Sequence, residues 1–356
     1  MKTVYSDDHR LQDGAAELIG GKLLPCYEMP ARADMILARV REVGLGEVLA
    51  PDDHGLAPLR RAHAGNYLAF LETAWDAWVA AHGAYDGLPL CWPIPGLRRD
   101  REPEHIDGKL GFFSFDAACP ITAGTWRAVR AAADVALTGQ AMVAAGAERA
   151  VFALCRPPGH HAGRDFCGGY CFLNNAAIAA EAFLAGGPDG TGGPGGTGAA
   201  ARVAILDVDY HHGNGTQAIF YDRADVFFAS LHGHPLQEYP YYLGFEDETG
   251  AGAGEGCTAN YPMRHGTGFD VWGRALDDAC DRIAAFGADA LVVSLGVDTF
   301  ADDPISEFKL ASDDYVAVGK RIAALALPTL FVMEGGYAVD AIGVNAVNVL
   351  TGFEAA

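Results

Sequence analysis

Short apolar, β-branched segments alternate with Ala-rich segments of helical period along most of this chain. The apolar segments, which we expect to be strands, fall at 149–155, 202–209, 225–232, 289–296 and 328–334. The helical segments between them fall at 126–146, 174–185, 271–286 and 312–326. Because strands that alternate with helices join through right-handed crossovers, the pattern predicts an α/β protein. Its single, mostly parallel central sheet should carry helices on both faces.

Two segments interrupt this alternation. Residues 186–198 are so rich in glycine that we expect a flexible surface loop without a function of its own. Residues 82–119 are rich in proline, and a loop of this length inside a compact domain usually serves as a lid or an interface. No repeat or linker divides the chain, so we expect a single domain over residues 1–356.

The composition indicates an acidic protein with a large core. Hydrophobic residues make up 50% of the chain and charged residues only 20%, which argues against disorder. The formal net charge of −21 disfavours nucleic acid or an anionic membrane as a partner. It either attracts cationic small molecules or has no electrostatic role. The N-terminal segment lacks an apolar signal core, no run approaches the ~18 apolar residues of a membrane span, and no Cys-x-x-Cys pair occurs. We therefore expect a cytoplasmic protein with reduced thiols.

Two carboxylates and two imidazoles stand directly behind the apolar segment 203–206. They are Asp207, Asp209, His211 and His212. If the strand stays extended through His211, then Asp207, Asp209 and His211 point to one side, because side chains alternate across a strand. Carboxylates and imidazoles bind zinc and similar divalent ions, and a strand end holds them rigidly. The cluster therefore predicts a metal site.

Reactive side chains follow three other predicted strands as well. They are His160 and His161 after 149–155, Asp298 after 289–296, and Tyr337 after 328–334. Since ligands of open parallel sheets bind at the carboxyl ends of the strands, we expect these groups to meet the metal site at one rim. His232 and His234 follow a further strand, and we interpret them as rim histidines rather than as additional ligands.

These residue types favour hydrolysis by water. A metal with three protein ligands keeps a fourth position for water or substrate, where it polarises a carbonyl and lowers the pKa of the water. A histidine can take the proton and pass it to a leaving nitrogen, and a tyrosine hydroxyl can donate to the developing oxyanion. The chain has no Gly-x-Ser-x-Gly motif and no cysteine in an evident nucleophile context, so covalent catalysis fits less well.

Several motifs of the sequence resemble those of the zinc-dependent histone deacetylase family. They are residues 156–161 (Arg-Pro-Pro-Gly-His-His), 168–175 (Gly-Gly-Tyr-Cys-Phe-Leu-Asn-Asn), 207–216 (Asp-Val-Asp-Tyr-His-His-Gly-Asn-Gly-Thr), 230–232 (Ser-Leu-His), 296–298 (Gly-Val-Asp) and 334–337 (Glu-Gly-Gly-Tyr). Residues 241–250, 259–263 and 298–305 narrow the resemblance to the bacterial acetylpolyamine amidohydrolases. The resemblance implies the arginase/deacetylase fold and an enzyme that removes acetyl or short acyl groups from amines, acetylated polyamines above all.

The resemblance also assigns roles to single residues. It implies Zn²⁺, with Fe²⁺ or another divalent ion as alternatives, on Asp209, His211 and Asp298. Its implied catalytic residues are His160, His161, Tyr337, Asp207 and Asn214. In this assignment His161, with Asn214 behind it, is the general base and acid. His160 is an electrostatic partner that donates a hydrogen bond to Asp207, and Tyr337 polarises the acetyl carbonyl.

Further implied features concern a second cation, the substrate and the assembly. A structural K⁺ is expected against Asp207, Asp209, His211, Ser230 and Leu231. Tyr170 and Tyr239 are expected to wall the channel for a slender acylated chain. Polyamine-directed members carry a substrate-binding glutamate where this chain has Ala118, and Asp116 or Asp107 is the candidate to replace it. The loop 82–119 is expected to narrow the entrance and to form a homodimer, which leaves a small cationic N-acetylated amine as the substrate.

Three other functions stay open at this point. The same chemistry could serve acetyl-lysine in peptides or proteins, or another small N-acyl amine. An arginase-type dimanganese ureohydrolase needs a second metal with further acids, but the order after Asp298 is Thr-Phe-Ala-Asp rather than a tight Asp-x-Asp. A metal-dependent binding module without activity would not need the set His160, His161 and Tyr337.

Overall fold

The structure is a computed structural model that describes residues 1–187 and 199–356. Its main element is a sheet of eight strands within these ranges, in the order β4-β1-β5-β10-β9-β6-β7-β8. The strands are β1 (Lys2–Val4), β4 (Val48–Leu49), β5 (Ala150–Ala153), β6 (Val203–Asp207), β7 (Val226–Gly233), β8 (Thr258–Met263), β9 (Ala290–Leu295) and β10 (Thr329–Met333). Every pairing in this sheet is parallel, which confirms the predicted α/β architecture.

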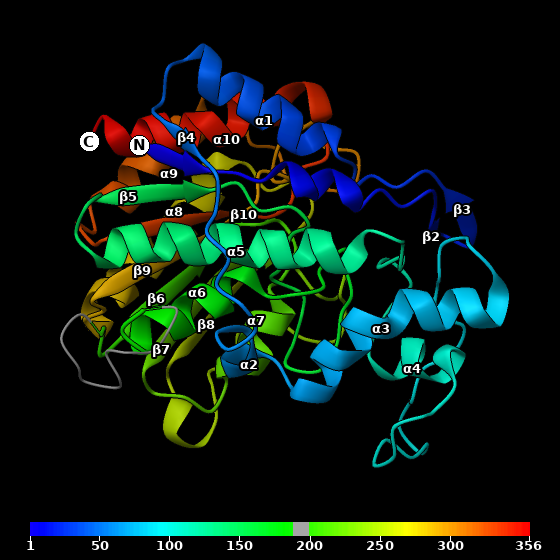
Figure 1. Ribbon diagram of the computed structural model, residues 1–356. Helices are drawn as coiled ribbons and strands as arrows, with labels where there is room; N and C mark the ends of the chain where they lie inside the picture. The colour runs from blue at the N-terminus through cyan, green and yellow to red at the C-terminus, as the bar shows by residue number, and fades with distance from the viewer. Residues whose placement is uncertain (188–198) are drawn as a thin grey trace.

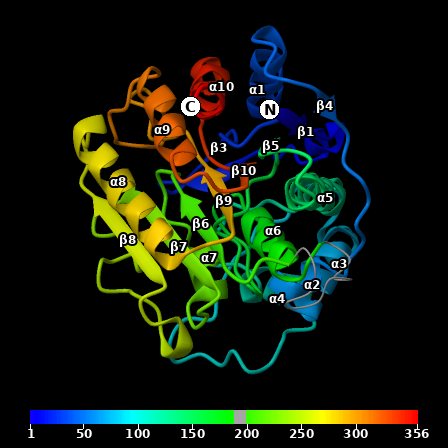
Figure 2. The same cartoon turned by 90° about the vertical axis from the view of Figure 1, so that its left-hand side faces the viewer.

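Helices cover both faces of the sheet, as Figures 1 and 2 show. One face carries α1 (Ala31–Glu42), α8 (Phe269–Phe286), α9 (Asp314–Ala323) and α10 (Val339–Glu354). The other face carries α2 (Leu59–Ala62), α3 (Gly65–His82), α5 (Thr125–Ala144) and α6 (Asn175–Leu184). Between two helical layers the central strands are buried on both sides. This explains why their sequences are almost continuously apolar.

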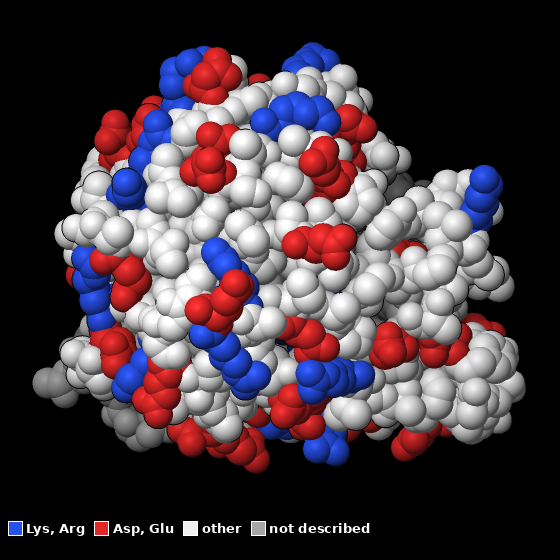
Figure 3. All heavy atoms as spheres, turned by 90° about the horizontal axis from the view of Figure 1, so that it is seen from above, with Lys and Arg blue, Asp and Glu red and all other residues white. Residues whose placement is uncertain are grey.

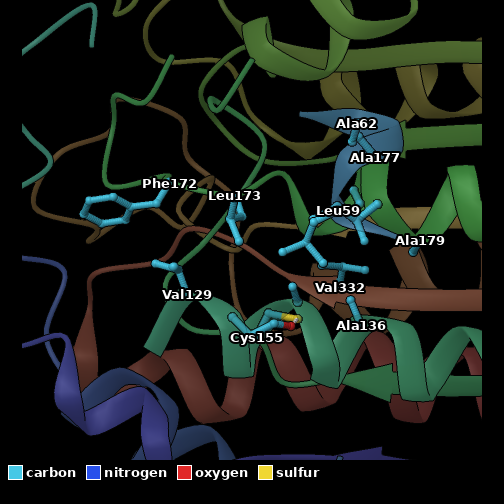
Figure 4. Close-up of a cluster of buried hydrophobic side chains, with 14 of the residues drawn as sticks. Leu59, Ala62, Val129, Ala136, Cys155, Phe172, Leu173, Ala177, Ala179 and Val332 are labelled. Atoms are coloured by element: carbon cyan, nitrogen blue, oxygen red, sulfur yellow. Dashed lines mark hydrogen bonds between the residues drawn. The ribbon is translucent and has the colours of Figure 1, made fainter. Parts of the chain in front are cut away.

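Each face of the sheet has its own hydrophobic cluster. Figure 4 shows part of the cluster under α5 and α6, where Leu59, Val129, Ala177 and Val332 come from α2, α5, α6 and β10. The Ala-rich sequences of α5 and α6 suit this layer, because small side chains let a helix lie close to a sheet. On the opposite face α9 and α10 cross so closely that a Cβ at Gly319 would lie 1.9 Å from the carbonyl oxygen of Val349.

Two short elements that the sequence analysis missed lie beyond the main sheet. The antiparallel hairpin of β2 (Glu17–Ile19) and β3 (Lys22–Leu24) turns at Gly20 and Gly21, both with positive φ, as two-residue hairpin turns require. The helix α4 (Ile106–Phe112) lies inside the predicted loop 82–119. Both elements extend to the right in Figure 1.

The helix α4 escaped prediction because it contains two glycines, which are poor helix formers. Gly111 is nevertheless required, since a Cβ there would lie 1.6 Å from the carbonyl oxygen of Cys91. The remaining elements are the helix α7 (Asn214–Phe220) and the 3₁₀ helices η1 (Asp7–Leu11) and η2 (Gly252–Gly254). No helix within the described ranges is both long and apolar enough to cross a membrane. The predicted glycine-rich loop 186–198 lies outside the described residues, except for its first two.

Candidate metal centre and active site

Four loops meet at the carboxyl ends of β5, β10, β9 and β6, which are neighbours in the sheet. They carry the predicted residues His160 and His161, Tyr337, Asp298, and the Asp207–His212 cluster. The strand does not stay extended through His211, because the ladder of β6 ends at Asp207. The backbone N–H of Asp209 donates to Asp207 Oδ1 (3.1 Å) and that of His211 to Asp209 Oδ1 (2.9 Å), and such turns take the chain out of the ladder.

Asp209, His211 and Asp298 form a compact buried cluster. Their candidate ligand atoms all lie within 4.8 Å of one another. His211 Nδ1 lies 3.1 Å from Asp298 Oδ2 and 3.5 Å from Asp209 Oδ1. Tetrahedral zinc with bonds of ~2.0 Å separates its ligand atoms by ~3.3 Å. Burial and the neighbouring Asp209 carboxylate raise the pKa of Asp298 to about 7, which indicates negative charge that a cation would stabilise. The cluster therefore fits a zinc ion.

Glycines let the backbone approach these carboxylates closely. The backbone N–H of Gly335 donates to Asp209 Oδ2 at 2.8 Å. A Cβ at Gly335 would lie 2.5 Å from Asp298 Oδ2 and 2.6 Å from Asp209 Oδ2. The N–H of Tyr210 likewise donates to Asp298 Oδ1 at 2.8 Å. Each acid is thus oriented by a backbone donor, an arrangement that fixes metal ligands.

Each of the two adjacent histidines has a partner at Nδ1. His160 Nδ1 donates to Asp207 Oδ2 at 3.0 Å, and His161 Nδ1 donates to the amide oxygen of Asn214 at 2.6 Å. Because Nδ1 carries the proton in both bonds, Nε2 is the nitrogen at which each ring can gain or lose a further proton. Both residues are only 3% exposed, so they are not the exposed loop pair that an isolated His-His sequence could form.

The surroundings of the two histidines shift their pKa values in opposite directions. Burial lowers the pKa of His161 well below its usual range, and the neighbouring His160 and His211 lower it further. Burial also opposes a charge on His160, but Asp209 and Asp207 outweigh it and raise the pKa of His160 to about 10. A cation on Asp209 would reduce that rise. At neutral pH His161 therefore has an unprotonated Nε2 that is free to accept a proton, whereas the acids around His160 favour its charged form.

A pocket of about 410 Å³ opens beside these groups. Its lining includes His161, His211 and Tyr337 together with the two predicted aromatic residues Tyr170 and Tyr239. The Tyr170 and Tyr337 rings lie 5.6 Å apart, and Tyr239 meets the edge of His161 at 5.2 Å between centroids. The pocket can therefore hold a slender chain next to the candidate metal ligands.

Three carboxylates also line this pocket. Asp116 accepts hydrogen bonds from the Tyr239 hydroxyl (2.7 Å) and the N–H of Gly169 (2.9 Å). The others are Glu17, from the β2–β3 hairpin, and Glu238. The sequence analysis missed both, because a lone acid in a hairpin or a loop has no local signature. Ala118 lines the pocket as well, whereas Asp107 lies outside its lining, on α4, and pairs with His82 at 2.6 Å.

His232 lies at the carboxyl end of β7 and belongs to neither of the candidate metal groups among the described residues. Its side chain is fully buried, whereas His234 is half-buried. Both ring nitrogens of His232 have hydrogen-bond partners. Nε2 donates to the carbonyl oxygen of Gly244 and Nδ1 accepts from the Ser230 hydroxyl, both at 2.8 Å. This tautomer turns the hydroxyl proton of Ser230 toward His232 and leaves the oxygen lone pairs free. Among the described residues, the carbonyl oxygens of Asp209 and His211 accept no hydrogen bond either. Oxygens of this kind are the ligands that the predicted monovalent cation would need.

Comparison with known proteins places this site in a family. Residues 26–353 match the histone deacetylase domain. Acetylpolyamine amidohydrolase 1 of Pseudomonas aeruginosa is 60% identical over 100% of this chain and 99% of its own length. The acetylpolyamine amidohydrolase of Mycoplana ramosa is 52% identical over 99% of each chain.

Solved structures show the same relationship. A crystal structure of the acetylpolyamine aminohydrolase of Burkholderia pseudomallei superposes with a TM-score of 0.91 at 38% identity, covering 100% of this chain and 99% of the other. The HDA15 HD domain superposes with a TM-score of 0.77 at 26% identity, covering 99% and 90%. The chain belongs to the histone deacetylase family.

Proposed function

We propose that this protein is a metal-dependent amidohydrolase that removes acetyl groups from acetylated polyamines. Its substrates would be small N-acetylated amines with a second, cationic nitrogen. The observation that carries this proposal is the uncompensated negative charge of the pocket beside the candidate metal ligands.

The hydrogen-bond partners of Glu17 and Asp116 are neutral, whereas Glu238 lies 3.3 Å from the imidazole of His265. Within the part of the chain that the structure describes, no lysine or arginine lines the pocket. Burial raises the pKa of both Glu17 and Asp116, as expected for carboxylates without a cationic partner. Burial makes the charged form of these carboxylates unfavourable, and a substrate ammonium would stabilise it. The rings of Tyr170 and Tyr239 suit an alkyl chain or an ammonium group. The names of the relatives support the same substrate class.

The face of the molecule seen in Figure 3 has no comparable cluster of acidic side chains without basic ones among them. There the acidic and basic side chains are interspersed and separated by wide uncharged areas. On this face no cluster of acidic side chains competes with the pocket carboxylates for a cationic substrate. This arrangement supports a small amine rather than an extended polyanion as the ligand.

Each residue of the site has a separate role in the proposed reaction. Zinc held by Asp209, His211 and Asp298, or Fe²⁺ or another divalent ion there, would polarise the acetyl carbonyl and lower the pKa of the attacking water. His161 Nε2 takes the proton from this water and delivers it to the leaving amine nitrogen. His160, held by Asp207, acts as an electrostatic partner beside the developing negative charge. The Tyr337 hydroxyl donates a hydrogen bond to the oxyanion.

Exposed apolar side chains on the loop 82–119 support a homodimer. Leu90 is 82% exposed, and Ile94 and Leu97 are each 62% exposed, which is unusual for side chains of this size. Sedimentation of the wild type against Leu90→Ser/Ile94→Ser tests this interface. A wild-type monomer would refute it.

Three further parts of the proposal have separate support. Both hydrophobic clusters pack on the same sheet, which supports a single domain over 1–356. All eight cysteines are free, which supports a reducing, cytoplasmic location. The Ser230 hydroxyl oxygen and the carbonyl oxygens of Asp209 and His211, which accept no hydrogen bond among the described residues, support a structural K⁺. Thermal unfolding in potassium chloride against choline chloride tests this ion, and equal midpoints would contradict it.

A competition between matched substrates tests the proposed activity. N-acetylputrescine and N-pentylacetamide have the same chain length in heavy atoms, but only the first has a distal ammonium. We expect kcat/KM to be at least tenfold higher for N-acetylputrescine, about 1.4 kcal/mol of differential binding. Equal values would refute the proposal that the pocket selects a cationic group. A preference for an acetyl-lysine peptide would mean that the substrate is a peptide rather than a polyamine.

A further inference from the structure

Glu334 connects the loop of the two histidines with the loop of Tyr337. It follows β10 directly and is only 1% exposed. Its Oε2 accepts the backbone N–H groups of Gly159 (2.6 Å) and His160 (3.2 Å). In sequence it begins the segment Glu-Gly-Gly-Tyr, whose Gly335 N–H holds Asp209. One residue thus joins three parts of the candidate active site.

Other contacts hold the remaining sides of the histidine loop. The carbonyl oxygen of His160 accepts the N–H groups of Gly215 and Thr216, each at 3.1 Å. Gly159 lies against the start of α6, where a Cβ would come within 2.5 Å of the backbone nitrogen of Asn175. The Glu334 carboxylate therefore supplies the acceptor for two buried N–H groups. Without it, both groups would be left unsatisfied, which a folded chain avoids by shifting.

We infer that Glu334 is a positioning residue, whose carboxylate sets the place of the two histidines relative to Tyr337 and Asp209. This inference rests on the proposed deacetylation. Only Oε2 carries the role, since Oε1 is buried and has no hydrogen-bond partner among the described residues. An acceptor at the position of Oε2 is therefore required, rather than a negative charge.

Three substitutions separate the acceptor from the charge. Glu334→Met has a similar length but no acceptor, Glu334→Gln keeps an acceptor without the charge, and Glu334→Asp keeps the charge but is one methylene too short. Because a displacement of ~1 Å can cost ~10²-fold in rate, we expect the Met and Asp variants to lose about 100-fold in kcat. KM and bound zinc should stay near the wild-type values. Glu334→Gln should keep kcat within about tenfold of the wild type.

A buried glutamate elsewhere gives the matched control. Glu181 lies on α6 and pairs with Arg223, away from the histidine loop. Glu181→Met should lower stability and leave kcat unchanged below its unfolding temperature. A loss of kcat in this control equal to that of Glu334→Met would assign the effect to general destabilisation and overturn the inference.

Other outcomes would overturn it as well. Wild-type kcat in Glu334→Met, or in Glu334→Asp if the Met variant does not fold, would remove the positioning role. A loss in Glu334→Gln as large as in Glu334→Met would show that the charge matters instead. The amide proton resonance of Gly159 tests the contact without any activity, because a 2.6 Å bond to a carboxylate should move it downfield in the wild type and not in Glu334→Met. An inactive wild type with this downfield resonance would refute the proposed function and leave the contact standing.

Discussion

Replacing Tyr337 by phenylalanine removes one hydroxyl group and little else. The ring is 7% exposed and packs against the Tyr170 ring and the Arg32 guanidinium, whose central carbon lies 4.7 Å from the Tyr337 ring centroid. The backbone N–H of Tyr337 donates to Asp303 Oδ2 at 2.7 Å, a bond that the substitution keeps. The hydroxyl itself has no hydrogen-bond partner among the described residues. No partner is left unsatisfied, so the stability should change by less than ~1 kcal/mol.

The expected effect of Tyr337→Phe on catalysis is much larger. Burial raises the pKa of the Tyr337 hydroxyl well above its ordinary value, so the group keeps its proton and can donate throughout the neutral range. Loss of one oxyanion donor typically costs ~10²–10³ in kcat, about 2.7–4 kcal/mol of transition-state stabilisation. Steady-state turnover of N-acetylputrescine, with zinc content and unfolding temperature measured on the same sample, checks this. A kcat within about threefold of the wild type, with zinc retained, would refute the role of the tyrosine.

Three further predictions test the neighbouring parts of the site and the fold. His161→Ala should abolish deacetylation more completely than His160→Ala, and the reverse ranking in kcat would reassign the general base. Gly335→Ala should weaken zinc binding in a competition with a chelator, because its Cβ would come within 2.6 Å of two candidate ligand oxygens; unchanged affinity would contradict the ligand geometry. Burial lowers the pKa of His63 to about 4, against about 6.5 in the unfolded chain, so the unfolded state binds the additional proton. The stabilisation of the folded state by neutral His63 should be complete above about pH 6.5 and be lost as the pH falls toward 4. The free energy of unfolding of His63→Gln, measured with denaturant, should therefore decrease less toward acid pH than that of the wild type. An identical pH dependence would contradict this.

The sequence predicted the strands β5, β6, β7, β9 and β10, because they are buried on both faces. Such strands need nearly continuous apolar residues, which are visible without tertiary information. The short strands β1 and β4 and the partly exposed edge strand β8 were not predicted. The hairpin β2–β3 was overlooked although Gly20-Gly21 is a hairpin signal, and α4 was hidden by its glycines. The residue at which β6 ends could not be predicted from its apolar sequence. Its ladder stops at Asp207 because side-chain oxygens bind the following N–H groups, which depends on the folded geometry.

Within the site, the residues that the sequence revealed are those in dense motifs at strand ends. His160, His161 and Asp298 are recognisable because reactive side chains directly follow an apolar segment. Glu17 and Glu238 come from a hairpin and a loop far apart in the chain, and only the fold brings them to one pocket. The burial of His232 could not be predicted from the sequence, because one of its two hydrogen-bond partners, the carbonyl group of Gly244, lies in a loop whose position depends on the fold.

X-ray absorption at the zinc edge of the purified protein, together with its metal content, tests the central claim most directly. With Asp209, His211 and Asp298 as ligands, we expect one zinc per chain and a first shell of nitrogen and oxygen at ~2.0–2.1 Å without sulfur. The neighbouring buried group of His160, Cys171 and Glu334 also has its candidate ligand atoms within 4.8 Å of one another, and zinc there would add a sulfur shell at ~2.3 Å. A sulfur shell, or close to two metal ions per chain, would contradict the proposed centre.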